Sequence, residues 1–321
     1  MLERLPAPLA CAAWIAGATP DWARFLRALH DPARTQSRKL AALLGPNTAF
    51  AREHDFAALR TVRDFQHAVP VRDYDALAPW IARMLDGEPG VLTSERVLMF
   101  EKTSGSSGAA KYIPFTASLR REFQAAVRAW MCDLHFHRPA LFDGPAYWCI
   151  TPIARERETT RGGLPVGFES DAEYFAPREQ RLLAALMAVP GAVARAPSVE
   201  AALYATLRHL LQQPGLRFIS VWSPSFLTVL LDTLARHADR LLDDLRDGAR
   251  AAELRRDLSP ARIWPRLRTI SCWADGAASA LLPAVSAAFP GVEIQPKGLL
   301  ATEGVVTIPL TGREGGALAL T

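Results

Sequence analysis

Apolar residues in the first part of the chain recur with a helical period. Trp22, Phe25, Leu26 and Leu29 are spaced by three and four positions, which places them along one face of a helix. The same spacing returns between residues 64 and 85, with prolines as the breaks. The pattern predicts a helical segment over residues 1–92 that packs against the region after it.

The pattern changes near residue 96, where short β-branched or aromatic runs begin to alternate with longer amphipathic runs. This alternation indicates an α/β fold in which layered, largely parallel sheets are flanked by helices. An α/β region is therefore expected over residues 93–321, after the helical segment. The predicted strands are 96–101, 145–151, 217–222, 268–273, 291–296 and 304–309, and the predicted helices are 116–133, 177–189, 198–213, 224–247 and 277–289.

Composition narrows the class of protein. Half of the 321 residues are hydrophobic, which is enough for a large core, and the net charge is only +4. Charges of both signs are interleaved, without the basic stripe typical of nucleic-acid binding. No apolar run reaches the roughly 18 residues of a membrane span, and the four cysteines form no Cys-x-x-Cys pair. We therefore expect a cytoplasmic protein with reduced cysteines that binds neither nucleic acid nor membrane.

A stretch rich in glycine and hydroxyl side chains follows the apolar run 97–100 and precedes a helix expected to begin near Thr116. Between a strand and a helix, such a loop can wrap an anion, because glycines let the backbone approach while amides and hydroxyls point at phosphate oxygens. A flexible surface turn is the alternative. The candidate phosphate-binding residues are Thr103, Ser104, Gly105, Ser106, Ser107, Gly108 and Lys111.

The spacing of this stretch excludes two common nucleotide-binding motifs. Only Ser106 and Ser107 separate Gly105 from Gly108, and Lys111 comes three positions later. A Walker A loop has about four residues between its glycines and a lysine directly after the second. The Gly-x-Gly-x-x-Gly order of a dinucleotide site is also absent.

A second motif, near the end of the sequence, places a hydroxyl beside a carboxylate. Thr302 and Glu303 lie in the otherwise apolar run 297–308, between two apparent strands. A carboxylate among such neighbours is costly to bury without a partner. A magnesium ion that carries ATP phosphates is one suitable partner, and a salt bridge is an equally good alternative.

Further candidates follow predicted strands, at the ends where ligands gather in parallel sheets. Val221 and Trp222 end the strand 217–222 and lie where a ligand wall is expected. Asp275 and Gly276 leave the next strand. They form either an ordinary turn or a backbone that approaches a flat ring, since glycine permits close stacking.

Together, the two motifs resemble those of adenylate-forming enzymes, which pair a Thr/Ser/Gly-rich phosphate loop ending in Lys with a downstream Thr-Glu. Within that superfamily the chain looks most like the Gretchen Hagen (auxin-responsive promoter) family of acyl-acid amido synthetases, plant enzymes with bacterial relatives. The similarity runs through most of the sequence. It is carried by residues 47–54 (Asn-Thr-Ala-Phe-Ala-Arg-Glu-His), 64–70 (Asp-Phe-Gln-His-Ala-Val-Pro), 103–108 (Thr-Ser-Gly-Ser-Ser-Gly), 163–167 (Gly-Leu-Pro-Val-Gly) and 298–304 (Gly-Leu-Leu-Ala-Thr-Glu-Gly).

The resemblance implies that ATP and Mg²⁺ activate a carboxylic acid substrate as an acyl-adenylate, which is then transferred to the amine of an amino acid acceptor. It implies that Ser104 to Gly108 hold the β- and γ-phosphates, that Thr302 contacts the α-phosphate region and that Glu303 holds the magnesium ion. The other roles that it implies are adenine binding by Ala274, Asp275 and Gly276, and acyl binding by Val221 and Trp222.

The sequence also departs from the family pattern. The third nucleotide motif of the family, Tyr-Arg-x-Gly-Asp, and its C-terminal lid domain with a catalytic lysine are absent. We therefore expect the N-terminal part of a longer acyl-adenylating ligase, a poor catalyst by itself, in which no catalytic residue is assigned. The alternatives are an acyl-CoA-forming ligase with the same first step and a non-catalytic protein that binds an acyl acid or a nucleotide.

Overall fold

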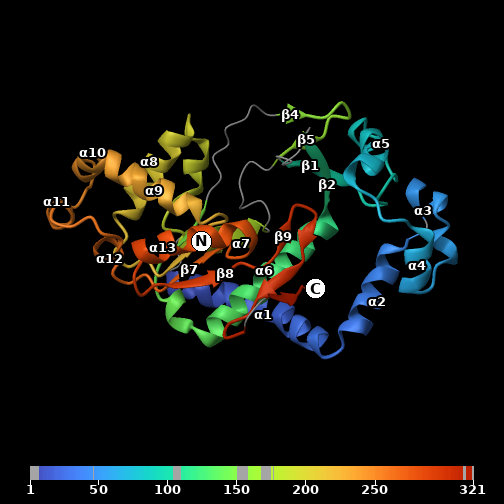
Figure 1. Cartoon of the computed structure of the whole chain (residues 1–321), viewed down its shortest axis with the longest axis horizontal. Coiled ribbons are helices and arrows are strands. Elements are labelled where there is room, and N and C mark those ends of the chain that lie inside the picture. The colour runs from blue at the N-terminus through green and yellow to red at the C-terminus, as the bar shows by residue number, and fades with distance from the viewer. Residues whose placement is uncertain are drawn as a thin grey trace.

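The structure is a computed structural model that describes residues 7–45, 47–103, 110–149, 158–167, 175, 177–313 and 316–319. Its described part combines helices with several sheets, as Figure 1 shows. Up to residue 85 the described elements are all helical, and the first strand begins at Val97. The predicted mixture of α and β structure, with helices first, is therefore confirmed. None of the described helices has the length and apolar character needed to cross a membrane.

Several helices of the N-terminal region begin at polar residues that cap their first turn. Asp31, Thr48 and Asp73 each accept a hydrogen bond from an amide three residues further on, and Thr61 and Asp64 form a reciprocal capping box. Such caps satisfy amides that have no partner within the helix. The helices are α1 (Ala7–His30), α2 (Pro32–Leu43), α3 (Ala49–Glu53), the 3₁₀ helix η2 (Phe56–Ala58), α4 (Val62–Ala68) and α5 (Tyr74–Leu85).

Four parallel strands form the main sheet, in the order β3-β6-β7-β8. Each lies within a strand predicted from the sequence. Helices connect them, because parallel neighbours need a crossover between them. The strands are β3 (Ala146–Trp148), β6 (Phe218–Ser220), β7 (Thr269–Cys272) and β8 (Glu293–Pro296).

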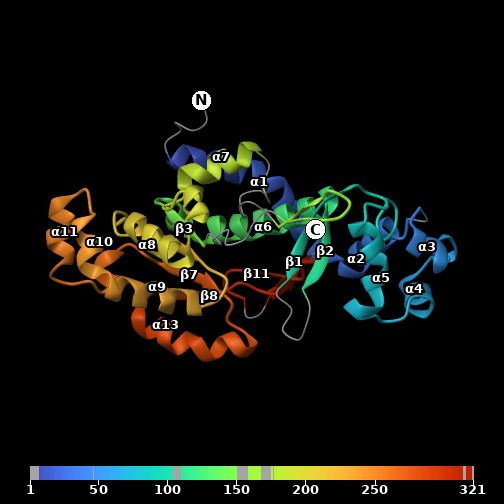
Figure 2. The ribbon, with the colours of Figure 1, turned by 90° about the horizontal axis from the view of Figure 1, so that it is seen from above.

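Helices cover both faces of this sheet (Figure 2). Phe218 packs with α1, with α6 (Ala117–His137) and with α7 (Pro177–Leu186). The next residue, Ile219, packs on the opposite face, because successive side chains of a strand alternate. The helices on that face are η5 (Gly191–Arg195), α8 (Val199–Leu210), α9 (Ser225–Arg236), α10 (Ala238–Asp243), α11 (Gly248–Leu254), α12 (Pro260–Ile263) and α13 (Leu282–Ala288).

A second, mixed sheet has the order β2-β1-β5-β4. Its first two strands, β1 (Val97–Thr103) and β2 (Lys111–Thr116), are antiparallel, while β5 (Pro165–Val166) is parallel to β1 and antiparallel to β4 (Glu158–Thr159). Phe100 of β1 is fully buried against α5. The N-terminal helices and this sheet therefore share a hydrophobic core.

Two short hairpins end the described chain. The first joins β9 (Leu300–Ala301) to β10 (Gly304–Val305), and the second joins β11 (Thr307–Pro309) to β12 (Gly316–Leu318). Leu300 and Val305 pack with Met99, Phe115 and Phe123. This contact holds the first hairpin against the β1–β2 sheet and α6.

The predicted position of the Gly/Ser stretch between a strand and a helix is wrong. β2 intervenes, so the stretch connects two antiparallel strands, and β1 belongs to the mixed sheet rather than to the parallel one. Pro114 hides β2 in the sequence because proline interrupts a strand pattern. Proline is tolerated here because β2 is an edge strand, where a backbone donor is dispensable.

Three other elements are divided where the sequence predicted continuity. The strand 304–309 is interrupted at Val306, and the helix 224–247 breaks at His237 between α9 and α10. The helix 277–289 begins as the 3₁₀ helix η6 (Gly276–Leu281) before α13 starts. Pro283 in the first turn of α13 favours this restart, since proline suits the first turn of a helix.

Candidate active site

The strands β1 and β2, which flank the Gly/Ser loop, are held by side chains from two other elements, α5 and β4. Residues 104–109, which include the predicted phosphate-binding residues Ser104 to Gly108, lie outside the described part of the chain. Thr103 and Lys111 form the last cross-strand pair. The Nζ atom of Lys111 lies 5.6 Å from the centre of the Tyr74 ring on α5, a cation–π distance. The lysine of the motif is thus placed beside the start of the loop.

A second set of contacts holds the same strands from the other side. Lys102 Nζ donates to Glu158 of β4 at 2.7 Å, and Tyr112 Oη donates to the other oxygen of that carboxylate at 2.6 Å. The Glu158 carboxylate raises the pKa of Lys102 above its usual value. These bonds couple both strands of the hairpin to β4, so the two ends of the loop are held in register.

Thr302 and Glu303 form the two-residue turn between β9 and β10, where Ala301 pairs with Gly304. Glu303 is exposed, and it has no hydrogen-bond or ion-pair partner within the described ranges. Glu303 is therefore exposed at a turn and does not bear the cost of burial that its apolar neighbours in the sequence suggested. The salt bridge considered as an alternative is not found among the described residues.

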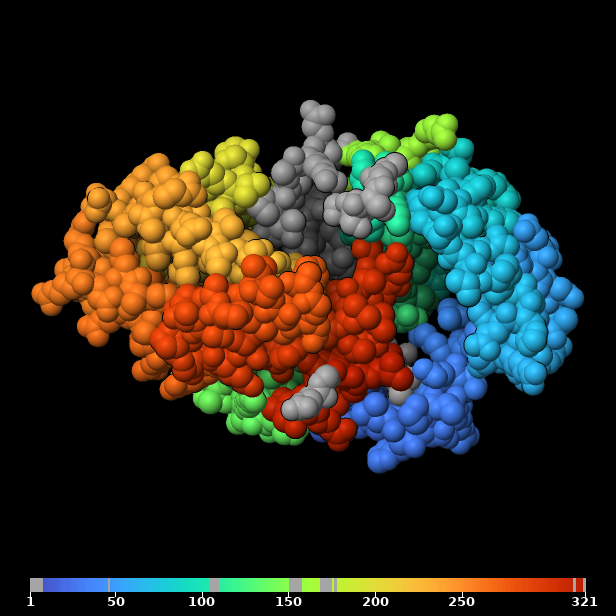
Figure 3. Space-filling model, in the orientation of Figure 1, coloured from blue at the N-terminus to red at the C-terminus, as the bar shows by residue number. Residues whose placement is uncertain are grey.

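Glu303 lines a groove of about 1200 Å³ whose other walls come from α1, α2, residues 92–95 and the start of α6. Figure 3 shows the hollow between the blue N-terminal helices and the red C-terminal segment. Glu95 on its wall accepts a hydrogen bond from the Ser118 amide at 3.0 Å and another from the Ser118 hydroxyl. These bonds lower the pKa of Glu95 and fix the first turn of α6.

The predicted acyl and adenine residues meet at the carboxyl ends of β6 and β7. The amide of Trp273 donates to the carbonyl of Trp222 at 2.8 Å, and the two indole rings lie 5.9 Å apart. Both tryptophans are exposed, at 37% and 40%. Val221 is buried in the main core instead, so its side chain does not face the surface beside Trp222.

The three adenine candidates follow Trp273 directly. Ala274 is half-buried, whereas Asp275 and Gly276 are exposed at the start of η6. Gly276 has a φ of +56°, a left-handed conformation that glycine adopts without a steric penalty. The backbone is therefore open at this turn, and Trp273 offers the nearest aromatic surface along the chain.

The structure gathers the candidates into two groups. Lys111 and Thr103 belong to the mixed sheet, against which the hairpin carrying Thr302 and Glu303 packs. Trp222 and residues 274–276 lie instead at the edge of the parallel sheet. Between described residues, no hydrogen bond or ion pair joins one group to the other.

One residue of the second group was missed by the sequence analysis. Lys297 follows β8 directly, and its Nζ atom donates to Ser220 Oγ on β6 at 2.5 Å. The same nitrogen lies 5.0 Å from the ring centre of Trp130 on α6 and 5.1 Å from that of Trp222. A single lysine after a strand resembles any solvated surface charge. Its place at the carboxyl end of a predicted parallel strand was the only available signal.

Burial lowers the pKa of Lys297 to about 8, although the side chain is not fully shielded from solvent. Two cysteine thiols, Cys272 and Cys149, oppose this shift weakly. In the described part of the chain, no carboxylate lies within ion-pair distance of the amine. The carboxyl end of the parallel sheet thus carries the partly desolvated ammonium group of Lys297 between two aromatic rings.

Comparison with known proteins now identifies the family. A sequence model described as the GH3 family N-terminal domain matches residues 22–260, well over half of the chain. The chain belongs to the GH3 family. This is the Gretchen Hagen family that its motifs resemble, so that prediction is confirmed.

Curated and solved GH3 proteins extend the comparison. The chain is 28% identical over 252 residues to a protein of Oryza sativa subsp. japonica named probable indole-3-acetic acid-amido synthetase GH3.12, covering 74% of this chain and 39% of the rice protein. The structure of GH3.15 acyl acid amido synthetase matches with a TM-score of 0.73 at 17% identity, covering 89% of this chain and 56% of the other.

A second solved structure, AtGH3.15 acyl acid amido synthetase in complex with 2,4-DB, matches with a TM-score of 0.74 at 18% identity. It covers 86% of this chain and 55% of the other. At these identities the solved structures show the shared fold alone. This chain therefore has the fold of the GH3 N-terminal region, and it spans about half the length of the solved relatives.

Proposed function

We propose that this chain binds ATP and a carboxylic acid as part of an acyl-adenylating ligase that forms amides. The observation that carries the proposal is the family match over residues 22–260, because the rice relative bears the name of an amido synthetase. The packing of the Thr302–Glu303 turn on the β1–β2 sheet supports it. Both predicted phosphate motifs thereby belong to neighbouring elements.

In the proposed first step, an oxygen of the acid's carboxylate forms a bond to the α-phosphorus of ATP, and the bond to pyrophosphate breaks. In the second, an amine nitrogen forms a bond to the acyl carbon, AMP leaves with the electron pair, and the amine loses a proton. Phosphorus chemistry of this kind depends on positioning and on neutralisation of charge. The roles of this chain are therefore to hold phosphates at the β1–β2 loop and to orient the acid.

The residues present fit a magnesium ion that arrives with ATP. No group of three or more His, Cys, Asp or Glu side chains among the described residues is arranged to hold a metal by itself. Magnesium commonly takes one or two protein carboxylates together with phosphate oxygens and water. Glu303, exposed at its turn and unpaired in the described structure, supplies such a carboxylate, and the ion would neutralise phosphate charge.

Pyrophosphate exchange into ATP tests the first step. The chain would be assayed, alone and as its longest natural form, with pools of indole-acetic, benzoic, jasmonic-like and fatty acids. Exchange that depends on one pool is expected for at least the longest form. Binding of acids or nucleotide by that form without exchange would favour the non-catalytic alternative. Adding coenzyme A or amino acids after adenylation separates the two ligase classes by the product formed.

The substitution Glu303→Ala tests the metal role. We expect it to weaken ATP binding about tenfold in magnesium and to leave the weaker metal-free binding unchanged, since one oxygen ligand of the ion is lost. Asp232→Asn, which changes an exposed carboxylate on α9, is the matched control. Unchanged ATP affinity in magnesium, with the variant folded, would remove Glu303 from the site.

A further inference from the structure

The Lys297 amine carries a positive charge that the described chain does not balance. An ammonium group has three N–H donors, and Ser220 Oγ accepts one of them. The faces of Trp130 and Trp222 lie about 5 Å away and attract a cation weakly. Ion pairs within the described ranges include no contact of Lys297 with a carboxylate. An anion that arrives from solvent would therefore gain a charge-assisted hydrogen bond.

A row of polar side chains lies beside this amine. Ser220 of β6 pairs in register with Ser271 of β7 and with Trp148 of β3, and Ser271 pairs with Gln295 of β8. Residues at paired positions project to the same face of a parallel sheet. Gln295 is occupied, because its Oε1 accepts from Trp130 Nε1 at 3.2 Å. Ser271 Oγ and Trp148 Nε1, by contrast, are buried without a hydrogen-bond partner in the described structure.

Buried polar atoms without partners are rare and call for an explanation, of which a bound molecule is one. Here they share one sheet face with the hydroxyl that holds Lys297. The fully buried Ser271 is an observation independent of the lysine. Together they mark the carboxyl edge of the parallel sheet as a place built for a polar, negatively charged group.

The surroundings of the amine also specify what the anion is attached to. Trp222 and Trp273 expose neighbouring indole rings at the same edge. Exposed tryptophans offer large apolar surfaces on which a flat ring can stack. A phosphate would leave these rings unused, whereas an acid with an aromatic or otherwise flat apolar body would cover them.

We propose that the Lys297 ammonium, held by Ser220 between Trp130 and Trp222, binds the carboxylate of a flat apolar acid whose body rests on Trp222 and Trp273. This rests on the proposed function, because that acid is the one to be adenylated. Nothing in the motifs or in the family match assigns Lys297 this role. The amine would hold the carboxylate before activation and lose its counter-charge when the neutral acyl group forms.

Chemical modification of the amine gives the first test. The rate of Lys297 acetylation by an N-hydroxysuccinimide ester, followed by peptide mass spectrometry without ATP, would be measured with benzoate, phenylacetate, indole-3-acetate and decanoate. Each acid has an uncharged amide of the same shape as its control. We expect at least one flat acid to slow acetylation several-fold while its amide does not. Absence of protection by every acid, or equal protection by the amides, would overturn the proposal.

Equilibrium dialysis of the protecting acid gives the second test. We expect Lys297→Met to weaken binding about tenfold, the range of one charge-assisted hydrogen bond, and Lys297→Arg to retain part of the affinity. Circular dichroism and thermal unfolding would verify that both variants are folded. A folded Lys297→Met protein that binds the acid as tightly as the unchanged chain would contradict the proposal.

The pH dependence adds a readout that a purely structural lysine would not give. Affinity for the acid should fall as the pH rises through about 8, where Lys297 loses its charge. Within the described part of the chain, the other titratable groups that interact with it are the thiols of Cys149 and Cys272, so the profile should persist in a Cys149→Ala, Cys272→Ala variant. A profile that disappears with the thiols would assign the effect to them and overturn the role of Lys297.

A failure of the role proposed for Lys297 can be distinguished from a failure of the proposed function. Pyrophosphate exchange with a KM for the acid that Lys297→Met leaves unchanged would overturn the role of Lys297 and leave adenylation intact. Protection of Lys297 by an acid, when no pooled acid supports exchange by the longest natural form, would establish the acid site and overturn adenylation.

Discussion

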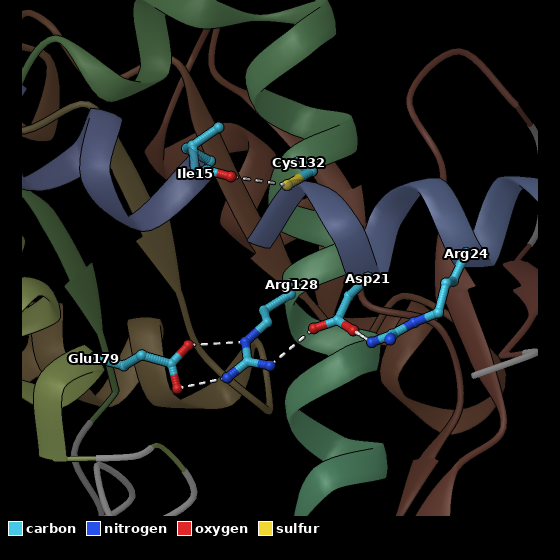
Figure 4. A network of polar contacts seen from close by, with 6 residues as sticks. All are labelled: Ile15, Asp21, Arg24, Arg128, Cys132 and Glu179. Carbon is cyan, nitrogen blue, oxygen red and sulfur yellow. Dashed lines mark hydrogen bonds and ion pairs between the residues drawn. The ribbon is translucent and has the colours of Figure 1, made fainter. Parts of the chain in front are cut away.

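Arg128 on α6 binds both carboxylate oxygens of Glu179 on α7, with Nε–Oε1 and Nη2–Oε2 distances of 2.8 and 2.7 Å (Figure 4). The remaining terminal nitrogen, Nη1, reaches Asp21 Oδ2 on α1 at 2.8 Å. One planar guanidinium therefore joins three helices, a geometry that a lysine cannot reproduce. All three side chains are largely buried, with exposures of 21% for Arg128, 16% for Glu179 and 6% for Asp21.

Arg128→Met should destabilise the protein by roughly 3–5 kcal/mol, the cost of removing one member of a buried ion-pair network. Urea unfolding followed by circular dichroism would measure the loss. Arg24→Met is the matched control, since Arg24 also pairs with Asp21 but is 67% exposed. Exposed pairs contribute about 0–1 kcal/mol. Equal losses in the two variants would mean that the Arg128 bridge adds nothing beyond a surface pair.

Glu95 should make the stability of the folded protein depend on pH in the acid range. Its folded-state pKa lies below the ordinary 4.5, chiefly because the Ser118 hydroxyl donates to it. A carboxyl whose pKa is depressed by folding stabilises the protein above its unfolded pKa and loses that contribution as the pH falls through the folded value. The unchanged chain should therefore exceed Glu95→Gln in stability at pH 5–7, and the difference should shrink below about pH 4.5.

The measurement is a series of urea midpoints between about pH 3 and 7. Ser118→Ala removes the hydroxyl donor and leaves the backbone amide bond to Glu95 in place. Because the amide bond still lowers the pKa of Glu95, the stability of Ser118→Ala should depend on pH less than that of the unchanged chain and more than that of Glu95→Gln. Stability curves of Glu95→Gln and the unchanged chain that run parallel at every pH would rule out the linkage.

Two glycines that flank the Thr302–Glu303 turn should respond differently to alanine. Gly298 has a φ of +76°, and an added Cβ would lie 2.8 Å from the Thr307 carbonyl oxygen. Gly304 has no atom within 4 Å of such a Cβ and an ordinary φ. We expect Gly298→Ala to cost roughly 1–3 kcal/mol through strain and crowding, and Gly304→Ala to cost under about 1 kcal/mol.

Thermal unfolding of the two alanine variants measures this contrast. Because Gly298 directly follows Lys297, its alanine variant should also disturb the Lys297–Ser220 contact and thus the acetylation rate of that amine. A Gly298→Ala protein with unchanged stability would mean that the backbone relaxes away from Thr307 without cost.

The four cysteines should differ in how fast their thiols react. Burial raises the pKa of Cys11 and of Cys132 to about 11, so at pH 8 the reactive thiolate fraction is on the order of one in a thousand. Cys149 is only half-buried. Iodoacetamide labelling followed by mass spectrometry should modify Cys149 first in the native protein and all four residues in urea. Rapid native labelling of Cys132 would show that α1 opens away from α6.

The main sheet was predictable because its short strands, such as Phe218–Ser220 with all three residues buried, alternate along the chain with longer amphipathic helices. The mixed sheet was harder. β4 and β5 span two residues each, too few for any alternation to be visible, and β2 contains a proline. Short strands depend on contacts with partners far along the chain, which local patterns do not contain.

Some residues of the candidate site were likewise visible in the sequence, and others were not. Glycines and hydroxyls at 103–108 and the Thr302–Glu303 pair were visible because their residue types are unusual beside apolar runs. Lys297 was not, because its character comes from Trp130, Ser220 and Trp222, which lie far from it in sequence. A pKa set by burial requires knowledge of the neighbours. The exposure of Glu303 likewise follows from a two-residue turn that hydrophobicity alone did not reveal.

The link between Asp21 and Arg128 has a consequence for synthesis of the chain. The two residues are 107 positions apart. At a translation rate of about 5–20 residues per second, α1 leaves the ribosome roughly 5–20 seconds before its partner helix. During that interval the apolar side of α1, which includes Trp14 and Ile15, lacks the surface that covers it in the folded protein. Until α6 emerges, the nascent chain therefore exposes apolar surface of the kind that promotes aggregation and that chaperones cover.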